Sequence, residues 1–482
     1  MRRILSFLLL VLVLSGCTIG PDYRKPVIET PSAWRFEEKE AREITNAAWW
    51  QQFNDPVLND LIRTALEENK DVKIAAARVE EFMGLYGVTR AAMFPQVYGG
   101  ALAGRSRQSE LQATPLTSAT QNPASTYALS LNGSWELDLW GKLRRGTEAA
   151  RADLLSQEEG RISVMLSLVA SVASAYVNLG TLDRQLDIAV KTAQSRKESY
   201  DLFQLQYQAG VISELELSQV KSEYEQALTT IPVLEKMVAQ QENALSVLLG
   251  RNPSPIPRGK KIDDLVLPAV PAGLPSVLLA NRPDIRQAEQ NLIAANARIG
   301  VARALYFPSI SLTGSFGVSS TDLSNLFTGA ARTWNWSAPL VTPIFTSGAI
   351  SGQIKAAEAQ QQQALFRYQQ TIQTAFREVE DALIDQKRSR DELEIQDRQI
   401  ESLQSYARFA RLRFDNGYTS YIEVLDAERS LFNAELVHAQ TKGVLFQALV
   451  NLYKAMGSGW TIETGGKATQ RDPERSAGTT GR

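Results

Sequence analysis

The second half of this sequence repeats the first. A shift of 213 residues places Val88–Val97 on Val301–Ile310, including a shared Phe-Pro pair. Further along the chain the shift becomes 207, so that Gly141 meets Gly348 and Leu249–Gly250 meets Met456–Gly457. Two unrelated segments would not stay aligned in this way along their whole length. The chain is a tandem duplication, and its two copies should fold to the same plan.

Each copy is predicted to contain a helix, a strand, a loop, a second strand, a very long helix, a turn and a return helix. The first copy covers residues 61–250 and the second covers 276–457. The remaining segments are 17–60, an inter-repeat linker at 251–275, and a polar tail at 458–482 that we expect to be disordered. The predicted strands are 95–107, 126–139, 308–318 and 333–345, and the predicted long helices are 141–208, 213–249, 348–415 and 420–456, with a shorter helix at 72–93.

The predicted strands alternate apolar and polar residues. In the first copy Leu129, Leu131 and Trp135 point to one side, while Ser130 and Asn132 point to the other. An apolar-out strand of about ten residues suits a transmembrane barrel, where every backbone group must be paired. A soluble β-sandwich with the apolar face inward is the alternative. Four strands cannot close a barrel alone, so the pattern favours oligomerisation.

The segment 141–208 contains no proline and would span about 100 Å as a helix. Apolar residues recur in it every seven positions, as at Val172 and Leu179, which indicates coiled-coil packing. Gly210 and Gly417 are placed to form tight turns between the antiparallel helices. Pro232 interrupts one return helix and is expected to bend it.

The N-terminus has the features of an export signal. Arg2 and Arg3 precede an apolar run that ends in Leu14-Ser-Gly-Cys17. This ending resembles the bacterial lipobox, which predicts a lipoprotein signal peptide at 1–16 and a covalent lipid on Cys17. An ordinary signal peptide is the alternative. Thr18 follows the cysteine instead of aspartate, which favours the outer membrane over the inner one.

Bulk composition and motif searches exclude several functions. The net charge of −2 gives no reason to expect nucleic acid. Beyond residue 16 we expect no apolar stretch long enough for a membrane-spanning helix. No phosphate-binding loop, nucleophile elbow or zinc motif occurs, so neither an enzyme nor a cofactor is predicted. The single histidine, His438, is predicted to be packed or to bridge two helices, and not to bind a metal.

Several sequence blocks resemble one family when they are taken together and in order. They are Trp135-Glu-Leu-Asp-Leu-Trp-Gly-Lys, Arg282-Pro-Asp-Ile-Arg-Gln-Ala-Glu, Phe307-Pro-Ser-Ile-Ser-Leu-Thr-Gly and Val424-Leu-Asp-Ala-Glu-Arg. The chain is similar to the TolC-like outer-membrane efflux factors, in particular to the lipidated NodT-type branch. The resemblance implies an α+β membrane protein: a homotrimer with a twelve-stranded transmembrane β-barrel, four strands per chain, continued by a periplasmic α-helical coiled-coil barrel. Residues 251–275 would belong to an equatorial belt.

The resemblance also implies function, location and partners. Such a duct is anchored in outer-membrane lipid and docks onto a periplasmic adaptor and an inner-membrane transporter, commonly of the resistance-nodulation-division type. It would conduct drugs or other small molecules outward. A duct of the same fold for type I protein secretion or metal-ion export is the nearest alternative, and a structural envelope lipoprotein is a more distant one.

A candidate gate lies just after the Gly417 turn. Asp426 and Arg429 are spaced to share one helix face, which alone would indicate an ordinary surface ion pair. The resemblance assigns these two positions, with the apolar Ile422, to the family's periplasmic constriction. Phe414 stands where relatives carry a tyrosine, so no hydroxyl bond can form from that position. The first copy has Gln219 and Ser222 opposite the two charges, so only one helix pair of each chain carries them.

The two turns at 208–217 and 416–425 are the predicted docking sites for the adaptor. The residues assigned to this role are Gly210, Val211 and Ser213 in the first turn, and Gly417, Tyr418 and Ser420 in the second.

Overall fold

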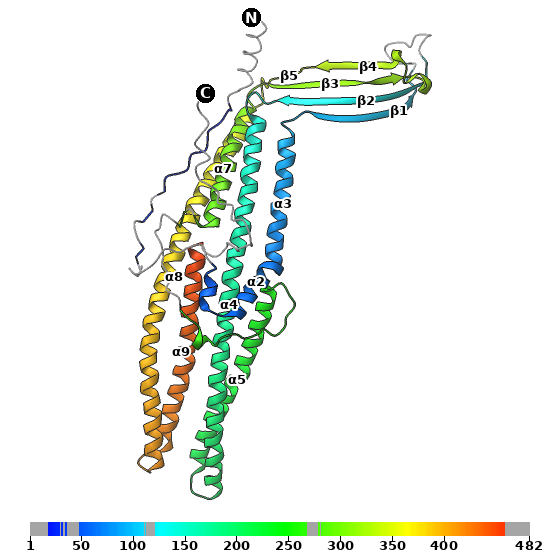
Figure 1. Cartoon of the computed structure of the whole chain (residues 1–482). Coiled ribbons are helices and arrows are strands. Elements are labelled where there is room, and N and C mark those ends of the chain that lie inside the picture. Colours follow the sequence, from blue (N-terminus) through cyan, green and yellow to red (C-terminus); the bar gives the residue numbers. More distant parts are fainter. Residues whose placement is uncertain are drawn as a thin grey trace. The chain divides into compact units, whose positions relative to one another are not determined.

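The computed structural model describes residues 18–28, 30–31, 34–35, 48–109, 111, 121–267, 278–279 and 281–457 (Figure 1). The predicted signal peptide 1–16, the predicted lipidation site Cys17 and the predicted tail 458–482 lie outside the described residues. So do residues 36–47 of the N-terminal segment and residues 268–275 of the linker.

Both copies show the same order of elements. After a short helix η1 (Trp49–Phe53) and α2 (Pro56–Glu68), the first copy contains α3 (Lys70–Ala91), β1 (Gln96–Ser106), β2 (Ala124–Leu137), α4 (Lys142–Gln208) and α5 (Glu214–Leu248). A short turn η2 (Ile262–Asp264) precedes the second copy, which contains α7 (Pro283–Ala304), β3 (Ser309–Ser320), η3 (Leu323–Asn325), η4 (Gly329–Ala331), β4 (Arg332–Ser337), β5 (Leu340–Val341), α8 (Ala349–Asp415) and α9 (Tyr421–Ala455).

The predicted single strand 333–345 is wrong. It is two short strands, β4 and β5, with Ala338 and Pro339 between them. Proline has no amide hydrogen to give to a ladder, and here the carbonyl of Pro339 instead accepts from the amide of Ser311 at 3.2 Å. Both short strands keep one register on β3, with Ser337 opposite Thr313 and Leu340 opposite Ile310, and the Ser311–Pro339 hydrogen bond lies in that register.

The chain divides into two compact units, and these do not coincide with the two copies. The first unit comprises Met1–Glu29, Ala75–Gly160 and Asp284–Ile372, and the second comprises Thr30–Ile74, Arg161–Pro283 and Gln373–Arg482. Each unit therefore takes a part from both copies, and the duplication did not produce two separate domains.

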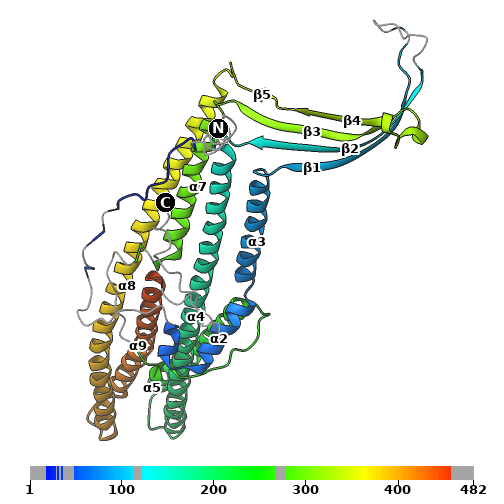
Figure 2. The ribbon, with the colours of Figure 1, turned by 45° about the horizontal axis from the view of Figure 1, so that its top comes forward.

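The sheet lies in the first unit and joins the two copies. Its strands are antiparallel in the order β1-β2-β3-β4, and β5 also pairs with β3 (Figures 1 and 2). The register sets Leu131, Phe316 and Trp334 opposite one another on one face. Asn132, Ser315 and Asn335 are opposite one another on the other face. The predicted alternation is thus one continuous apolar face across both copies, with Trp334 72 % exposed.

The second unit contains two antiparallel helical hairpins, one formed by α4 from Arg161 onward with α5, and one formed by α8 from Gln373 onward with α9 (Figure 1). Both end in glycines with positive φ, Gly210 at 70° and Gly417 at 74°. The amide after each glycine bonds back to the carbonyl five residues earlier, as in a Schellman motif. A β-carbon added at either glycine would meet no atom within 4 Å, so the backbone conformation alone favours glycine there. Helix α5 continues through Pro232 as one helix.

Most heptad positions of α4 are buried, including Val172, Leu179 and Ala189. Helix α4 also contains the one window among the described helices that is long and apolar enough, by length and composition, to cross a membrane. Our expectation that no such stretch follows residue 16 is therefore wrong. Half of that window is buried inside the chain, which is what heptad packing against neighbouring helices requires.

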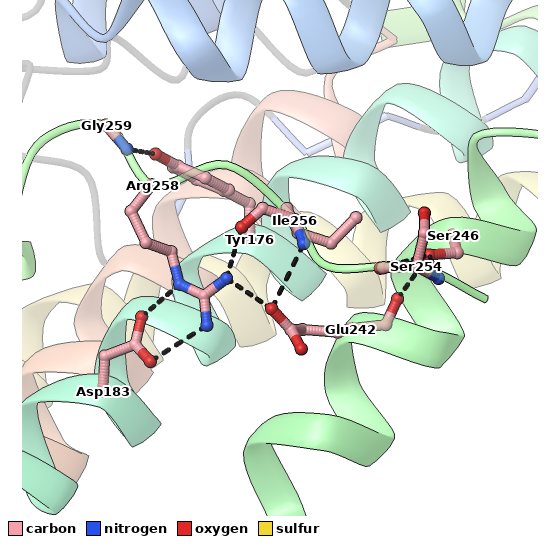
Figure 3. Close-up of polar contacts among 8 residues, drawn as sticks. All are labelled: Tyr176, Asp183, Glu242, Ser246, Ser254, Ile256, Arg258 and Gly259. Atoms are coloured by element: carbon pink, nitrogen blue, oxygen red, sulfur yellow. Dashed lines mark hydrogen bonds and ion pairs between the residues drawn. The ribbon is translucent and has the colours of Figure 1, made fainter.

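The segment that follows the first copy forms hydrogen bonds and ion pairs with both α4 and α5 (Figure 3). Arg258 bonds Asp183 of α4 at 2.6 Å and Glu242 of α5 at 2.6 Å. The amide of Gly259 donates to the Tyr176 hydroxyl at 2.9 Å. That hydroxyl in turn donates to the buried Asp55 carboxylate at 2.8 Å, and burial followed by this carboxylate raises the pKa of Tyr176. Residues expected in an equatorial belt thus tie the N-terminal segment and the linker to the first hairpin.

Candidate functional site

A pocket of about 510 Å³ opens between the two hairpins of the second unit, near their turns. Both copies contribute to it. The predicted gate residues Asp426, Arg429 and Ile422 line it together with Glu423 and Leu425 of α9, Tyr406 of α8, and Gln219, Ser222 and Glu223 of α5. Gln219 and Ser222 match Asp426 and Arg429 in the repeat. All four residues line this one pocket.

Asp426 and Arg429 form an ion pair on one face of α9. The Arg429 Nη2 atom lies 2.7 Å from Asp426 Oδ1, and each side chain is half-exposed. An exposed pair of this kind contributes about 0–1 kcal/mol to stability. Its importance is thus in where it places charge, and not in how strongly it holds the fold.

Tyr406 adds a hydroxyl that the sequence analysis missed. It donates to Asp426 Oδ2 at 3.4 Å from the antiparallel helix α8. Burial and then the Asp426 carboxylate raise the pKa of Tyr406. The signal was available, because Tyr406 precedes the Gly417 turn by about as many residues as Asp426 follows it.

Phe414 is not part of the pocket. Its ring lies 4.9 Å from Tyr421 and 6.1 Å from Phe203, in an apolar cluster that also contains Val220 and Val424. The structure therefore separates Phe414 from the other three predicted gate residues. A hydroxyl still reaches Asp426, but it comes from Tyr406.

Glu223, which lines the pocket, and Arg196, which pairs with it, were also missed. Glu223 Oε1 lies 3.9 Å from Arg429 Nη1, and Glu223 Oε2 lies 3.1 Å from Arg196 Nη1. No sequence motif marks either residue, because their significance depends on how the two hairpins pack.

The residues predicted for adaptor docking lie at the ends of the hairpins. Val211 is 71 % exposed and Tyr418 is 79 % exposed, so each turn presents an apolar side chain to solvent. Ser213 caps α5 by exchanging bonds with Glu216, whereas Ser420 makes no side-chain cap at the start of α9. Gly210 and Gly417 set the turns, as described above.

His438 bridges two helices. Its Nε2 atom lies 2.9 Å from Asp397 Oδ1, which links α9 to α8 and selects the bridging role from the two that were predicted. Among the residues that the structure describes, no group of three or more histidine, cysteine or acidic side chains could hold a metal ion.

The model of the family described as "Outer membrane efflux protein" matches residues 61–251 and 274–458, which are the two copies. The chain belongs to the outer membrane efflux protein family. The model described as "Prokaryotic membrane lipoprotein lipid attachment site" matches residues 1–18, which include Cys17. The resemblance to TolC-like efflux factors is confirmed.

Individual relatives agree with the family. The chain is 36 % identical over 99 % of its length to the probable efflux pump outer membrane protein TtgC of Pseudomonas putida, all of which is covered. It is 37 % identical over 93 % of its length to the cation efflux system protein CusC of Escherichia coli, of which 97 % is covered. The structure of the Campylobacter jejuni CmeC outer membrane channel superposes with a TM-score of 0.86 at 27 % identity, covering 92 % of this chain and 95 % of that one.

These relations establish the class of function. The protein is an outer-membrane exit channel of an efflux system, with the fold of that family, and it is not an enzyme. The predicted function and outer-membrane location are confirmed.

Proposed function

We propose that three copies of this chain close one channel, which conducts small molecules from an inner-membrane transporter and its periplasmic adaptor to the outside. The observation that carries the proposal is the sheet. Within the described residues, β1 and β4 each pair on one side only, and the apolar face they share is bare. An open edge is not stable inside a lipid bilayer, whereas a closed ring leaves none. Three copies of four strand positions would supply the twelve strands implied by the family.

The helices support the same assembly. Helix α7 of the second copy packs on α4 of the first. The Asn291 side chain accepts a hydrogen bond from Ser156 at 2.8 Å, and Arg298 pairs with Asp153. Its repeat partner α3 has no buried residue at all. In the repeat, Asp153 and Ser156 of α4 match Gln360 and Gln363 of α8. Both glutamines are exposed. Within one chain these two glutamines line a pocket with Asn291 and Arg298 of α7, and no helix among the described residues covers them. We infer that α3 of a second copy binds α8 there as α7 binds α4.

The lipid on Cys17 is also part of the proposal, and the match to a lipid attachment site supports it. The residues that follow are held near the junction of sheet and helix. The amide of Ile19 donates to the carbonyl of Trp140 at 3.1 Å, and Gly20 packs directly on Gly300. An acyl chain at residue 17 would therefore enter outer-membrane lipid beside the first residues of α4.

The cargo is proposed to be small organic molecules such as drugs and solvents, because TtgC and its relatives are named for efflux of antibiotics and toluene. Metal-ion export is the second candidate, since CusC is named for cation efflux. Susceptibility of a deletion strain to antibiotics, dyes, detergents and metal salts distinguishes them. Sensitivity to metal salts alone would contradict the first choice. The proposed transporter partner is of the resistance-nodulation-division type.

The gate is proposed to be the pocket at Asp426 and Arg429. Threefold symmetry would gather three copies of each residue around one axis, where a narrow ring of charge controls ion passage. We expect Asp426→Ala combined with Arg429→Ala to raise single-channel conductance in planar bilayers about two-fold or more. The pair Gln219→Ala and Ser222→Ala, at the matching uncharged positions, serves as the control. Unchanged conductance in the first variant would remove the gate assignment.

The exposed turns are proposed to dock the adaptor. Val211→Ser with Tyr418→Ser removes the two exposed apolar side chains and leaves both turn glycines in place. We expect drug resistance in the complemented deletion strain to fall, with unchanged yield of detergent-stable trimer, since neither side chain is packed. Thr229→Ala, an exposed change elsewhere on α5, is the control. Loss of trimer would instead assign the turns a structural role.

A further inference from the structure

Charged residues are rare in the sheet and are placed unevenly on its two faces. The five strands that the structure describes contain three of them, Arg105, Glu136 and Arg332. The register puts both arginines on the apolar face. Glu136 is on the polar face, where it lies opposite Ser311 of β3. Glu136 is therefore the one charged side chain that the described strands place on the polar face.

The polar face otherwise presents many neutral groups that form hydrogen bonds. One row of the register across this face contains Tyr98, Asn132, Ser315 and Asn335. In another row the hydroxyl oxygens of Thr313 and Ser337 lie 2.7 Å apart. Amides and hydroxyls bond equally well to water, to cations and to anions, because each has both a donor and an acceptor. The net charge of this face thus depends on Glu136.

Lys142, the first residue of α4, pairs with Glu136. Its Nζ atom lies 2.5 Å from Glu136 Oε1, and about one third of each side chain is exposed. An ion pair this exposed contributes about 0–1 kcal/mol to stability, so it is not what joins the sheet to the helix. Its main effect is to cancel the charge of Glu136. The second copy has Pro343 and Ala349 at the matching positions, so each chain has one such pair.

The turn between β2 and α4 fixes the position of Lys142 (Figure 1). Gly141 has a φ of 80°, which turns the chain sharply just before the helix. The Asp138 carboxylate accepts from the amides of Leu143 at 3.0 Å and Arg144 at 2.8 Å, and so holds the first turn of α4. The lysine is thereby placed beside Glu136 by contacts that do not involve its own side chain.

We propose that Glu136 and Lys142 set the charge of the channel lumen: the pair keeps the inner face of the barrel neutral, so the barrel admits solutes of either charge. The inference rests on the proposed trimer, in which the polar face of the sheet turns inward. It also extends the proposed cargo, because anionic, cationic and uncharged organic molecules would all cross the barrel. Without Lys142, three unpaired carboxylates would surround the lumen and favour cations.

The test is the reversal potential of the full-length lipidated protein in planar bilayers under a gradient of KCl. Salt is kept at about 0.1 M or below, where the field of a charge extends about 10 Å or more. We expect Lys142→Gln to raise the ratio of K⁺ to Cl⁻ permeability about two-fold or more, and Glu136→Gln to lower it by a similar factor. The double variant Glu136→Gln with Lys142→Gln is the matched control. It should return the ratio to that of the unaltered protein, because the two charges are removed together.

Opposite shifts are the result that only a charge effect produces. Unchanged ratios in both single variants would overturn the inference, and so would shifts of both in the same direction, which would indicate a general disturbance of the junction. A double variant that keeps the shift of either single variant would also overturn it, because the two residues would then not cancel one another. Yield of detergent-stable trimer checks that every variant has assembled.

A separate measurement tests the proposed trimer on which this inference rests. Ser315→Cys should react with a charged, water-soluble methanethiosulfonate and lower the conductance, because the polar face lines the lumen. Phe316→Cys, one residue along β3 on the apolar face, should not react. Reaction of Phe316→Cys in place of Ser315→Cys would mean that the apolar face lines the channel, and the proposed assembly would fail. Reaction of Ser315→Cys without opposite shifts at Glu136 and Lys142 would overturn this inference alone.

Discussion

Gly317→Ala should abolish the assembled channel. A β-carbon at this position would lie 2.2 Å from the carbonyl oxygen of Leu129 and 2.9 Å from the α-carbon of Ser130. Both atoms belong to the backbone of β2, so no side chain can rotate out of the way. The ladder between β2 and β3 joins the two copies, and forcing it apart should cost about 1–3 kcal/mol or more at the centre of the sheet. The measurement is the amount of heat-modifiable trimer in outer membranes.

Two other glycines make this prediction sharper. Gly100→Ala is the control, because its nearest neighbour would be the Ser130 hydroxyl at 3.4 Å and the second copy already carries Thr313 at the matching position. Gly104 is the repeat partner of Gly317, and in one chain a β-carbon there meets nothing within 4 Å. In a closed ring the β4 strand of the next copy would lie there, so Gly104→Ala should be as harmful as Gly317→Ala. A normal trimer with Gly104→Ala would contradict that ring register.

The repeat made much of this fold predictable. Glycines with positive φ occur in pairs separated by the predicted offset: Gly141 with Gly348, Gly210 with Gly417, and Gly250 with Gly457. Each pair begins or ends a long helix in both copies, so one local backbone requirement sets the same boundary twice. Strand alternation likewise predicted which face of the sheet is apolar, because the period of two fixes the side on which each residue lies.

The parts that were not predicted depend on contacts between segments far apart in the sequence. The break at Pro339 depends on which strand neighbours it, and the half-buried apolar window of α4 depends on the helices that cover it. Glu223 approaches Arg429 from the other hairpin, so no spacing along the chain could reveal it, whereas the spacing of Tyr406 and Asp426 about the Gly417 turn could have placed them together. The family resemblance assigned Phe414 to the gate, but its apolar ring packs against the nearby apolar cluster.

Arg78→Cys combined with Gln363→Cys should yield a chain that a short bis-maleimide links into covalent trimers. By repeat equivalence these positions match Asn291 and Ser156, whose side chains touch at 2.8 Å within one chain. If α3 of one copy seats on α8 of the next as α7 seats on α4, then residues 78 and 363 meet across each of three interfaces. The only native cysteine, Cys17, should carry a thioether-linked lipid and so offer no competing thiol. Denaturing electrophoresis after treatment of membranes should show dimers and trimers.

The control must test register as well as proximity. Glu80→Cys with Gln363→Cys moves one thiol by two residues, which turns it about 200° around α3 and away from α8. This pair should give mostly monomer, as should each single substitution. Trimers from the shifted pair but not from the matched one would mean that the copies meet through another face of α3. Efficient linkage of the matched pair would instead mean that α8 binds α3 of the next copy in the same way as α4 binds α7 within a chain.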